Sequence, residues 1–189
     1  MNLHHDGPLA EPSPWLRRWS HLLAPRARVL DVACGSGRHL YFLQGLGHAV
    51  TGVDLDISAA RAAVPLSELV QADLENQPWP MEDKNGRRQF DAVLVFNYLW
   101  RPLWPHLLDS LAPGGVLIYE TFSSGQAQWG RPRNPDFLLQ PGELIHRCQG
   151  LQIIAYECAL ESDPARVVQR IAAKRCTEAD FALSPAPLK

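Results

Sequence analysis

Apolar and polar residues follow two alternating patterns along this chain. Short apolar runs typical of buried strands are expected at 28–33, 48–54, 68–73, 90–96 and 116–121. Apolar residues recur at helical spacing between them, which predicts helices at 14–23, 38–46, 57–64, 102–111 and 141–148. Two closing strands, 151–156 and 166–173, are expected to form an antiparallel pair at the sheet edge. The alternation predicts an α/β fold with a doubly wound, mostly parallel sheet and helices on both faces.

Two internal segments show neither pattern. Residues 78–89 are polar and are expected to form a loop with a turn at Asn85-Gly86. Residues 122–140 exceed the roughly 12 to 15 residues usual for a structureless connection, so we expect a lid or binding loop there. The end of the chain, 176–189, is expected to be a loose tail.

Composition narrows the function classes. A chain of 189 residues with 46% hydrophobic content fits one domain, 1–189. The net charge of −2 provides no general attraction to phosphate backbones or anionic membranes, so nucleic acid is an unlikely partner and no membrane partner is expected. The four cysteines form no CxxC pair, which predicts no metal site. No secretion signal or membrane-spanning run is recognised, so a soluble, cytoplasmic protein is expected.

A glycine-rich turn follows the first predicted strand. Gly35 and Gly37 have no Cβ, so the backbone here can approach a ligand closely and present free N–H groups at the helix start. Asp31 lies just before the end of that strand. Asp54 ends the next strand, 19 positions beyond Gly35, where a carboxylate can bridge the hydroxyls of a ribose.

The same turn excludes two nucleotide sites. A dinucleotide fingerprint requires a third glycine where this chain has Leu40, and no Gly-Lys-Ser/Thr follows to make a P-loop. An adenosine without a pyrophosphate therefore fits best. In the helix that follows, Leu40, Leu43 and Leu46 are expected to face the core, and Gly47 is expected to end the helix with a positive φ.

The motifs VLDVACGSGRH and VTGVDLD resemble motifs I and II of the class I S-adenosylmethionine-dependent methyltransferases. The resemblance continues through QADLE (71–75), FDAVLVFNYL (90–99) and LAPGGVLIYETF (111–122). It implies a Rossmann-like sheet of seven strands, the last antiparallel, with S-adenosylmethionine as the cofactor and S-adenosylhomocysteine as its product. It also divides the domain into a helical lead (1–27), a cofactor-binding half (28–75) and an acceptor-side half (90–175).

The resemblance implies a set of cofactor contacts. Gly35 and Gly37 would pass under the methionine part, Asp31 would orient its ammonium group, Asp54 would bind the ribose, and Asp73 and Leu74 would face the adenine. The complete set is Asp31, Cys34, Gly35, Gly37, Asp54, Leu55, Asp73, Leu74 and Asn97. Structural alternatives stay open: Asp31 as a helix cap, Asp73 as part of a solvated turn, and Cys34 as a buried thiol.

The acceptor side is expected past the ends of the fourth and fifth strands, because ligands bind at the carboxyl ends of parallel strands. Methyl transfer needs a positioned nucleophile and exclusion of water, and it needs a base only if the nucleophile must lose a proton. The candidate catalytic residues are Asn97, Tyr98, Arg101, Tyr119, Glu120 and Arg131, with Thr121 beside them. Packing is the alternative for both tyrosines, and ion pairing is the alternative for Glu120 and Arg131.

Arg131 belongs to a segment, 123–144, that is expected to fold over the acceptor pocket and bind an anionic group on a small substrate. The Cys-Gly-x-Gly-Arg loop and the final strands are also similar to small bacterial methyltransferases of the tellurite-resistance type. Residues 161–166 lack the His-Arg pair of that type, so this resemblance implies fold and cofactor but no acceptor. A non-catalytic cofactor-binding regulator and a methyltransferase acting on protein or RNA remain the alternatives.

Overall fold

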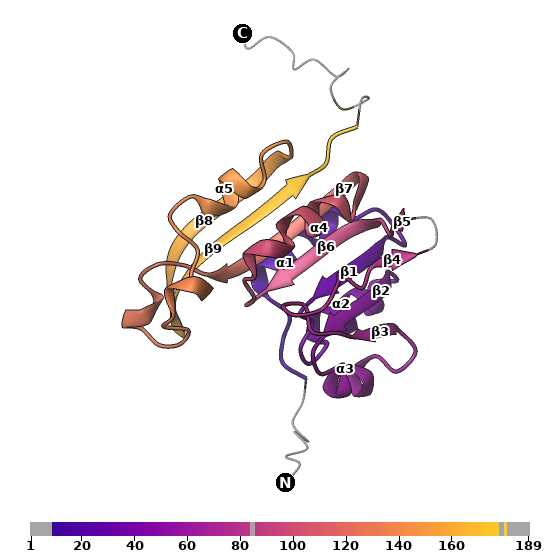
Figure 1. The fold of residues 1–189 in the computed structure, drawn as a ribbon, viewed down its shortest axis with the longest axis horizontal. Helices are drawn as coiled ribbons and strands as arrows, with labels where there is room; N and C mark the ends of the chain where they lie inside the picture. Colours follow the sequence, from indigo (N-terminus) through magenta and orange to yellow (C-terminus); the bar gives the residue numbers. More distant parts are fainter. Residues whose placement is uncertain (1–8, 84–85, 178–179, 181–189) are drawn as a thin grey trace.

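A seven-stranded sheet forms the centre of the protein in a computed structural model that describes residues 9–83, 86–177 and 180 (Figure 1). The strand order is β3-β2-β1-β6-β7-β9-β8. The strands are β1 (Arg28–Val32), β2 (Ala49–Asp54), β3 (Glu68–Gln71), β6 (Phe90–Phe96), β7 (Leu111–Phe122), β8 (Gln152–Ser162) and β9 (Ala165–Lys174). The first five pair in parallel, and β9 lies antiparallel between β7 and β8. The expected sheet, with its antiparallel last strand, is confirmed.

Helices cover both faces of this sheet, as expected. The helices are α1 (Pro14–Trp19), α2 (Arg38–Gly45), α3 (Ser58–Ala63), α4 (Trp104–Asp109) and α5 (Glu143–Arg147), and the 3-10 turns are η1 (Ser20–Leu22), η2 (Arg101–Leu103), η3 (Gln126–Gln128) and η4 (Pro135–Phe137). One hydrophobic core joins α1, α2 and α3 to the sheet, and a second core joins α4 and α5 to it. The sheet is therefore apolar on both sides, which explains the continuous apolar runs of its parallel strands.

The ends of α2 follow from two glycines. Gly37, at the N-cap, has φ +78°, and Gly47, just past the C-cap, has φ +87°, both in the left-handed region that glycine adopts without strain. The positive φ expected at Gly47 is confirmed. The expected inward orientation of Leu46 is wrong: its side chain is 53% exposed, because the helix ends at Gly45 and Leu46 no longer follows the helical spacing.

The segment expected to be a polar loop at 78–89 is partly ordered. It contains a short antiparallel hairpin of β4 (Glu82–Asp83) and β5 (Gly86–Arg87), and it buries the side chains of Trp79 and Met81. Apolar side chains inside a polar stretch explain this order, since their burial fixes the chain around them. Asn85, half of the expected turn, lies outside the described residues.

Other boundaries also differ from expectation: the helix expected at 14–23 ends at Trp19, and the strand expected at 151–156 continues to Ser162. The helix expected to end at Leu111 is shorter, and Leu111 instead begins β7. In the expected tail, Asp180 accepts a hydrogen bond from Lys174 at 2.8 Å, while the rest of the tail beyond residue 180 lies outside the described residues. Every helix within the described ranges is too short or too polar to span a bilayer.

Candidate active site

Three adjoining cavities lie where the parallel strands end. The glycine-loop cavity, of about 410 Å³, is lined by Gly35, Asp54 and Asn97 among others. The Asp73 cavity, of about 360 Å³, also borders Asp54. The Phe137 cavity, of about 220 Å³, shares Asn97 with the glycine-loop cavity. Tyr98 lines all three, so the cavities adjoin one another around this residue.

The two loop glycines serve different purposes. A Cβ on Gly35 would meet nothing within 4 Å, so this position borders open space in the cavity. A Cβ on Gly37 would lie 3.0 Å from the Cα of Ala60 in α3, so Gly37 permits close packing between α2 and α3. The Gly35 amide donates a hydrogen bond of 2.8 Å to Asp54, which ties the loop to the end of β2.

The carboxylate of Asp31, on β1, is buried and makes no hydrogen bond within the described residues. Its side chain is 1% exposed, and neither carboxylate oxygen accepts a hydrogen bond from any described residue. The alternative that Asp31 caps the next helix is excluded, because α2 has no side-chain cap. A buried carboxylate that makes no hydrogen bond is costly, so this group fits a cationic ligand group beside it.

His39, on α2, stands next to Asp31 and was not foreseen from the sequence. Its Nδ1 lies 3.7 Å from an Asp31 oxygen, and its Nε2 accepts a 3.3 Å hydrogen bond from the Ser13 amide. Because Nε2 is an acceptor, the proton of the neutral ring belongs on Nδ1, facing Asp31. The N-terminal segment thereby fixes the orientation of a ring that lines the glycine-loop cavity.

Asp54 and Asp73 are both held in place by backbone amides. Asp54 accepts from Gly35 and, through its other oxygen, from the Asp56 amide at 3.1 Å. Asp73 accepts from the amides of Glu75 and Asn76, and the Asn76 side chain, also a donor, lowers the pKa of Asp73 most. Asp73 therefore forms the turn that was its structural alternative, while still lining its cavity.

The other expected cofactor contacts differ in exposure. Both Leu55 and Leu74 line the Asp73 cavity, but Leu55 is 64% exposed, whereas Leu74 is buried and belongs to the core under α4 and α5. Cys34 is also buried; burial, followed by the nearby Asp31 and Asp54, raises the pKa of its thiol. Cys34 thus corresponds to the buried, protonated thiol that was its alternative.

Asn97 and Tyr98 mark the junction of the cavities. Asn97 adopts φ +55°, a left-handed conformation that asparagine tolerates better than most residues, and its amide donates to the Glu120 carbonyl at 2.9 Å. The Tyr98 hydroxyl donates to Glu75 over 3.5 Å. Burial, together with the nearby acids, raises the pKa of Tyr98, so its hydroxyl stays protonated at neutral pH.

Arg101 is fully engaged in holding the segment that follows β7. Its guanidinium pairs with both carboxylate oxygens of Glu143, at 2.8 and 2.9 Å, and donates to the carbonyls of Asp136 and Leu138. Burial opposes ionisation of Glu143, but the hydrogen bonds and charge of Arg101, together with hydrogen bonds from the Gln140 amide and Arg147, outweigh it and lower the pKa of Glu143 to about 2. Those two carbonyls flank Phe137, so Arg101 positions a wall of the Phe137 cavity.

Tyr119 is a packing residue in this structure. Its side chain is 1% exposed, stacks on Trp104 with ring centroids 4.9 Å apart, and donates a 2.8 Å hydrogen bond to the Tyr98 carbonyl. This hydrogen bond holds the backbone of Tyr98 in place. The packing alternative for Tyr119 therefore fits its surroundings.

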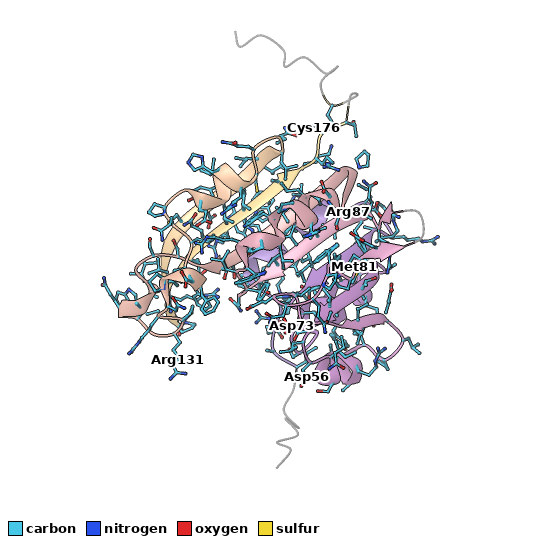
Figure 2. The ribbon with its side chains drawn as sticks, in the orientation of Figure 1. Asp56, Asp73, Met81, Arg87, Arg131 and Cys176 are labelled. Carbon is cyan, nitrogen blue, oxygen red and sulfur yellow. The ribbon has the colours of Figure 1, made fainter. Side chains whose placement is uncertain are left out.

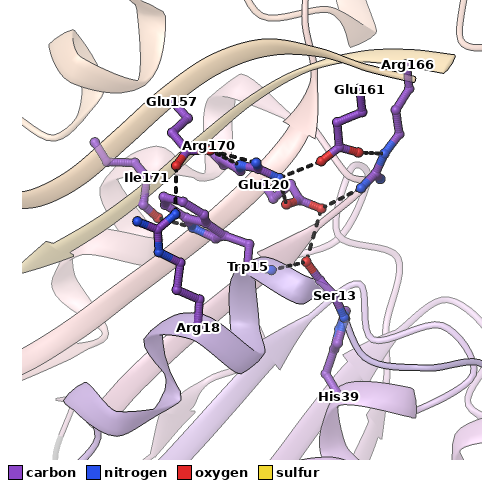
Figure 3. A network of polar contacts seen from close by, with 10 residues as sticks. All are labelled: Ser13, Trp15, Arg18, His39, Glu120, Glu157, Glu161, Arg166, Arg170 and Ile171. Atoms are coloured by element: carbon purple, nitrogen blue, oxygen red, sulfur yellow. Dashed lines mark hydrogen bonds and ion pairs between the residues drawn. The ribbon is translucent and has the colours of Figure 1, made fainter. Parts of the chain in front are cut away.

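Glu120 lies in a buried ion-pair network under α1 (Figure 3). It is 1% exposed and accepts hydrogen bonds from Ser13, Arg166 and Arg170 at 3.2, 3.4 and 3.4 Å. Glu161 pairs with both arginines in turn. The ion-paired alternative for Glu120 is the one that the structure supports, and it explains how a carboxylate is retained at the end of an apolar strand.

Arg131 lies outside the walls of the three cavities. Its side chain is exposed and points away from the body of the protein, far from Asp56 and Asp73 (Figure 2). The next residue, Pro132, does line the Phe137 cavity. The segment 123–140 thus contributes apolar groups to the site, while the expected arginine faces solvent.

A larger cavity, of about 570 Å³, opens at the opposite edge of the sheet, where the strands begin. Its arginines are already paired with acids: Arg28 with Asp91 at 3.0 Å and Arg88 with Glu68 at 2.7 Å. The carboxyl edge is the better candidate, because ligands of open α/β sheets bind there and the buried Asp31 carboxylate, which makes no hydrogen bond within the described residues, lies there. No group of acids, histidines and cysteines in the described ranges could hold a metal ion.

Comparison with known proteins finds similarity to methyltransferases. Residues 29–115 match the family model described as a methyltransferase domain. The tRNA U34 carboxymethyltransferase of Pseudomonas fluorescens is 31% identical over 129 residues, which cover 64% of this chain and 41% of that protein. The chain therefore spans less than half the length of this curated relative. That relative does not support the expectation that nucleic acid is an unlikely partner.

Two solved structures share the fold at low sequence identity. TehB from Haemophilus influenzae has a TM-score of 0.70 and 16% identity, over 87% of this chain and 62% of that chain. The 1,6-didemethyltoxoflavin-N1-methyltransferase of Burkholderia thailandensis, solved with its substrate and S-adenosylhomocysteine, has a TM-score of 0.62 and 16% identity, over 87% and 79% of the two chains. Residues 29–115 of this chain therefore match a methyltransferase domain, and the sheet that contains them has the class I methyltransferase fold.

Proposed function

We propose that this chain transfers a methyl group from S-adenosylmethionine to a small molecule. The observation that carries the proposal is the pair of carboxylates at the ends of adjacent strands, Asp31, whose oxygens accept no hydrogen bond from a described residue, and Asp54, fixed beside the glycine loop. Asp31 would hold the ammonium group of the cofactor, and Asp54 would hold the ribose hydroxyls. Leu55 and the Asp73 turn would enclose the adenine.

The arrangement of the cavities supports a direct displacement. A cofactor in the glycine-loop and Asp73 cavities would supply a sulfonium-bound methyl group near Asn97 and Tyr98, and these residues also border the Phe137 cavity. An acceptor in the Phe137 cavity would be held for in-line attack, its new bond to the methyl carbon forming as the carbon–sulfur bond breaks. The apolar walls of that cavity would exclude water.

An RNA acceptor is the second candidate, because a curated relative is named as a tRNA methyltransferase. The shared region covers only 41% of that protein, so parts that could dock tRNA have no counterpart in the match. A regulator that binds the cofactor without catalysis is the third candidate. The glycine-loop cavity and the Phe137 cavity share Asn97 and Tyr98, so a cofactor and an acceptor could lie side by side, and this favours an enzyme over a regulator.

Transfer of label from methyl-labelled S-adenosylmethionine distinguishes these candidates. The protein is incubated with a fractionated small-molecule extract and, separately, with bulk tRNA. We expect protein-dependent label in a small-molecule fraction and none in tRNA. Label found in tRNA alone would establish the second candidate instead, and cofactor binding without transfer to either pool would favour the regulator.

A further inference from the structure

The Phe137 cavity has predominantly apolar walls. Leu99, Phe122, Pro132 and Phe137 surround a space of about 220 Å³. The polar groups that line it are Asn97, Tyr98, Thr121 and Glu75. A space of this size between aromatic and proline faces suits a small, flat molecule, because such a molecule buries both of its faces against apolar side chains.

Among the described residues that line this cavity, none has a cationic side chain. The two arginines expected on the acceptor side are committed elsewhere: Arg101 makes hydrogen bonds to Glu143 and two carbonyls, and Arg131 points away from the body of the protein (Figure 2). A negatively charged acceptor would therefore lose its hydration in the cavity without gaining contact with a cationic side chain, which is unfavourable.

The charge at the cavity mouth has the opposite sign. Glu75 lines both the Phe137 cavity and the Asp73 cavity, and Asp54 and Asp73 border the adjoining space. The Glu75 carboxylate is exposed and accepts a hydrogen bond from the neutral hydroxyl of Tyr98. These acids favour the positive charge of a sulfonium cofactor and repel an anion approaching through the same opening.

We propose that the methyl acceptor is a small planar molecule without negative charge, and that Glu75 discriminates against anionic acceptors. The proposal rests on the proposed methyltransferase function and deepens it. The ring of the acceptor lies against Phe137 and Leu99, while the Asn97 side chain orients its nucleophilic heteroatom toward the methyl group. Arg101 acts as a positioning residue, since it holds the carbonyls on either side of Phe137.

Indole and indole-3-carboxylate provide matched probes with the same ring and different charge. Their binding is measured by calorimetry on protein saturated with S-adenosylhomocysteine. We expect indole to bind about tenfold more tightly than the carboxylate, because like charges that face each other across a site are unfavourable. Glu75→Gln should reduce this ratio to about threefold or less through tighter carboxylate binding, with indole affinity retained.

Two further variants test whether the binding differences arise at Glu75 and in the Phe137 cavity. Glu82→Gln removes the same charge from the exposed hairpin strand β4, which lies away from the three cavities, and should leave the ratio unchanged. Phe137→Ala should weaken indole binding by about tenfold, because it removes a large apolar face from the cavity.

The possible results separate this proposal from the proposed function. Preference for the carboxylate, an unchanged ratio in Glu75→Gln, or displacement of indole by tRNA would overturn the acceptor class while S-adenosylhomocysteine still binds. Failure of S-adenosylhomocysteine itself to bind would instead reject the proposed function.

Discussion

Replacing Asp54 with alanine is expected to weaken binding of S-adenosylmethionine about 10- to 150-fold, a loss of roughly 1.5 to 3 kcal/mol. The substitution removes charge-assisted hydrogen bonds to the ribose. It also removes the acceptor that ties the Gly35 amide to the end of β2 at 2.8 Å, so the glycine loop loses an anchor. The fold should survive, because Asp54 lies at the edge of a cavity and not in either hydrophobic core.

Calorimetric titration of the variant with S-adenosylhomocysteine measures this loss. Asp56→Ala is the matched control: it removes the same charge two residues further along, at a position that lines none of the three cavities. Its affinity should stay within about threefold of the parent protein, since exposed charges are well screened. Equal losses in both variants would show that Asp54 contributes only general negative charge.

The largest effect on stability is expected at Glu120. Glu120→Ala leaves Arg166 and Arg170 with one buried carboxylate fewer and removes the acceptor of the Ser13 hydroxyl (Figure 3). Breaking a buried ion pair costs about 3 to 5 kcal/mol, and we expect the lower end because both arginines keep Glu161. A loss of about 3 kcal/mol lowers the melting temperature of a chain this long by roughly 6 to 12 °C.

Chemical and thermal unfolding followed by circular dichroism measure this change. Glu157→Ala is the matched control in the same network, because Glu157 pairs with Arg18 and Arg170 near the surface, with 33% of its side chain exposed. Exposed ion pairs contribute about 1 kcal/mol or less. Comparable losses of stability in the two variants would show that the contribution of Glu120 does not depend on its burial.

The sequence predicted best those elements whose patterns are local. The strand at 90–96 matches β6 at both ends, because seven largely apolar residues between polar ones define it without help from elsewhere. Leu46 was misplaced because one residue past a helix end is enough to turn a side chain outward. Residues 78–89 were wrongly predicted to be a loop throughout, because Trp79 and Met81 contact their apolar neighbours only in the folded core.

Some residues of the candidate site were predicted from the sequence and others were not. The motif residues Asp31, Gly35 and Asp54 lie together, since consecutive parallel strands bring their ends to one edge. His39 and the role of Arg101 could not be foreseen, because their contacts join segments far apart in the chain. Arg101 meets Glu143 across 42 positions, and sequence spacing alone does not distinguish such a structural clamp from a catalytic arginine.

Titration calorimetry with S-adenosylhomocysteine and NAD, on the unmodified protein, tests the central claim most directly. The site has carboxylates for an ammonium group and a ribose, while Leu40 stands where a dinucleotide site requires a third glycine. We predict saturable binding of S-adenosylhomocysteine at one site per chain and no measurable binding of NAD. Tight binding of NAD, with no heat from S-adenosylhomocysteine, would contradict the assignment of this site to methyl transfer.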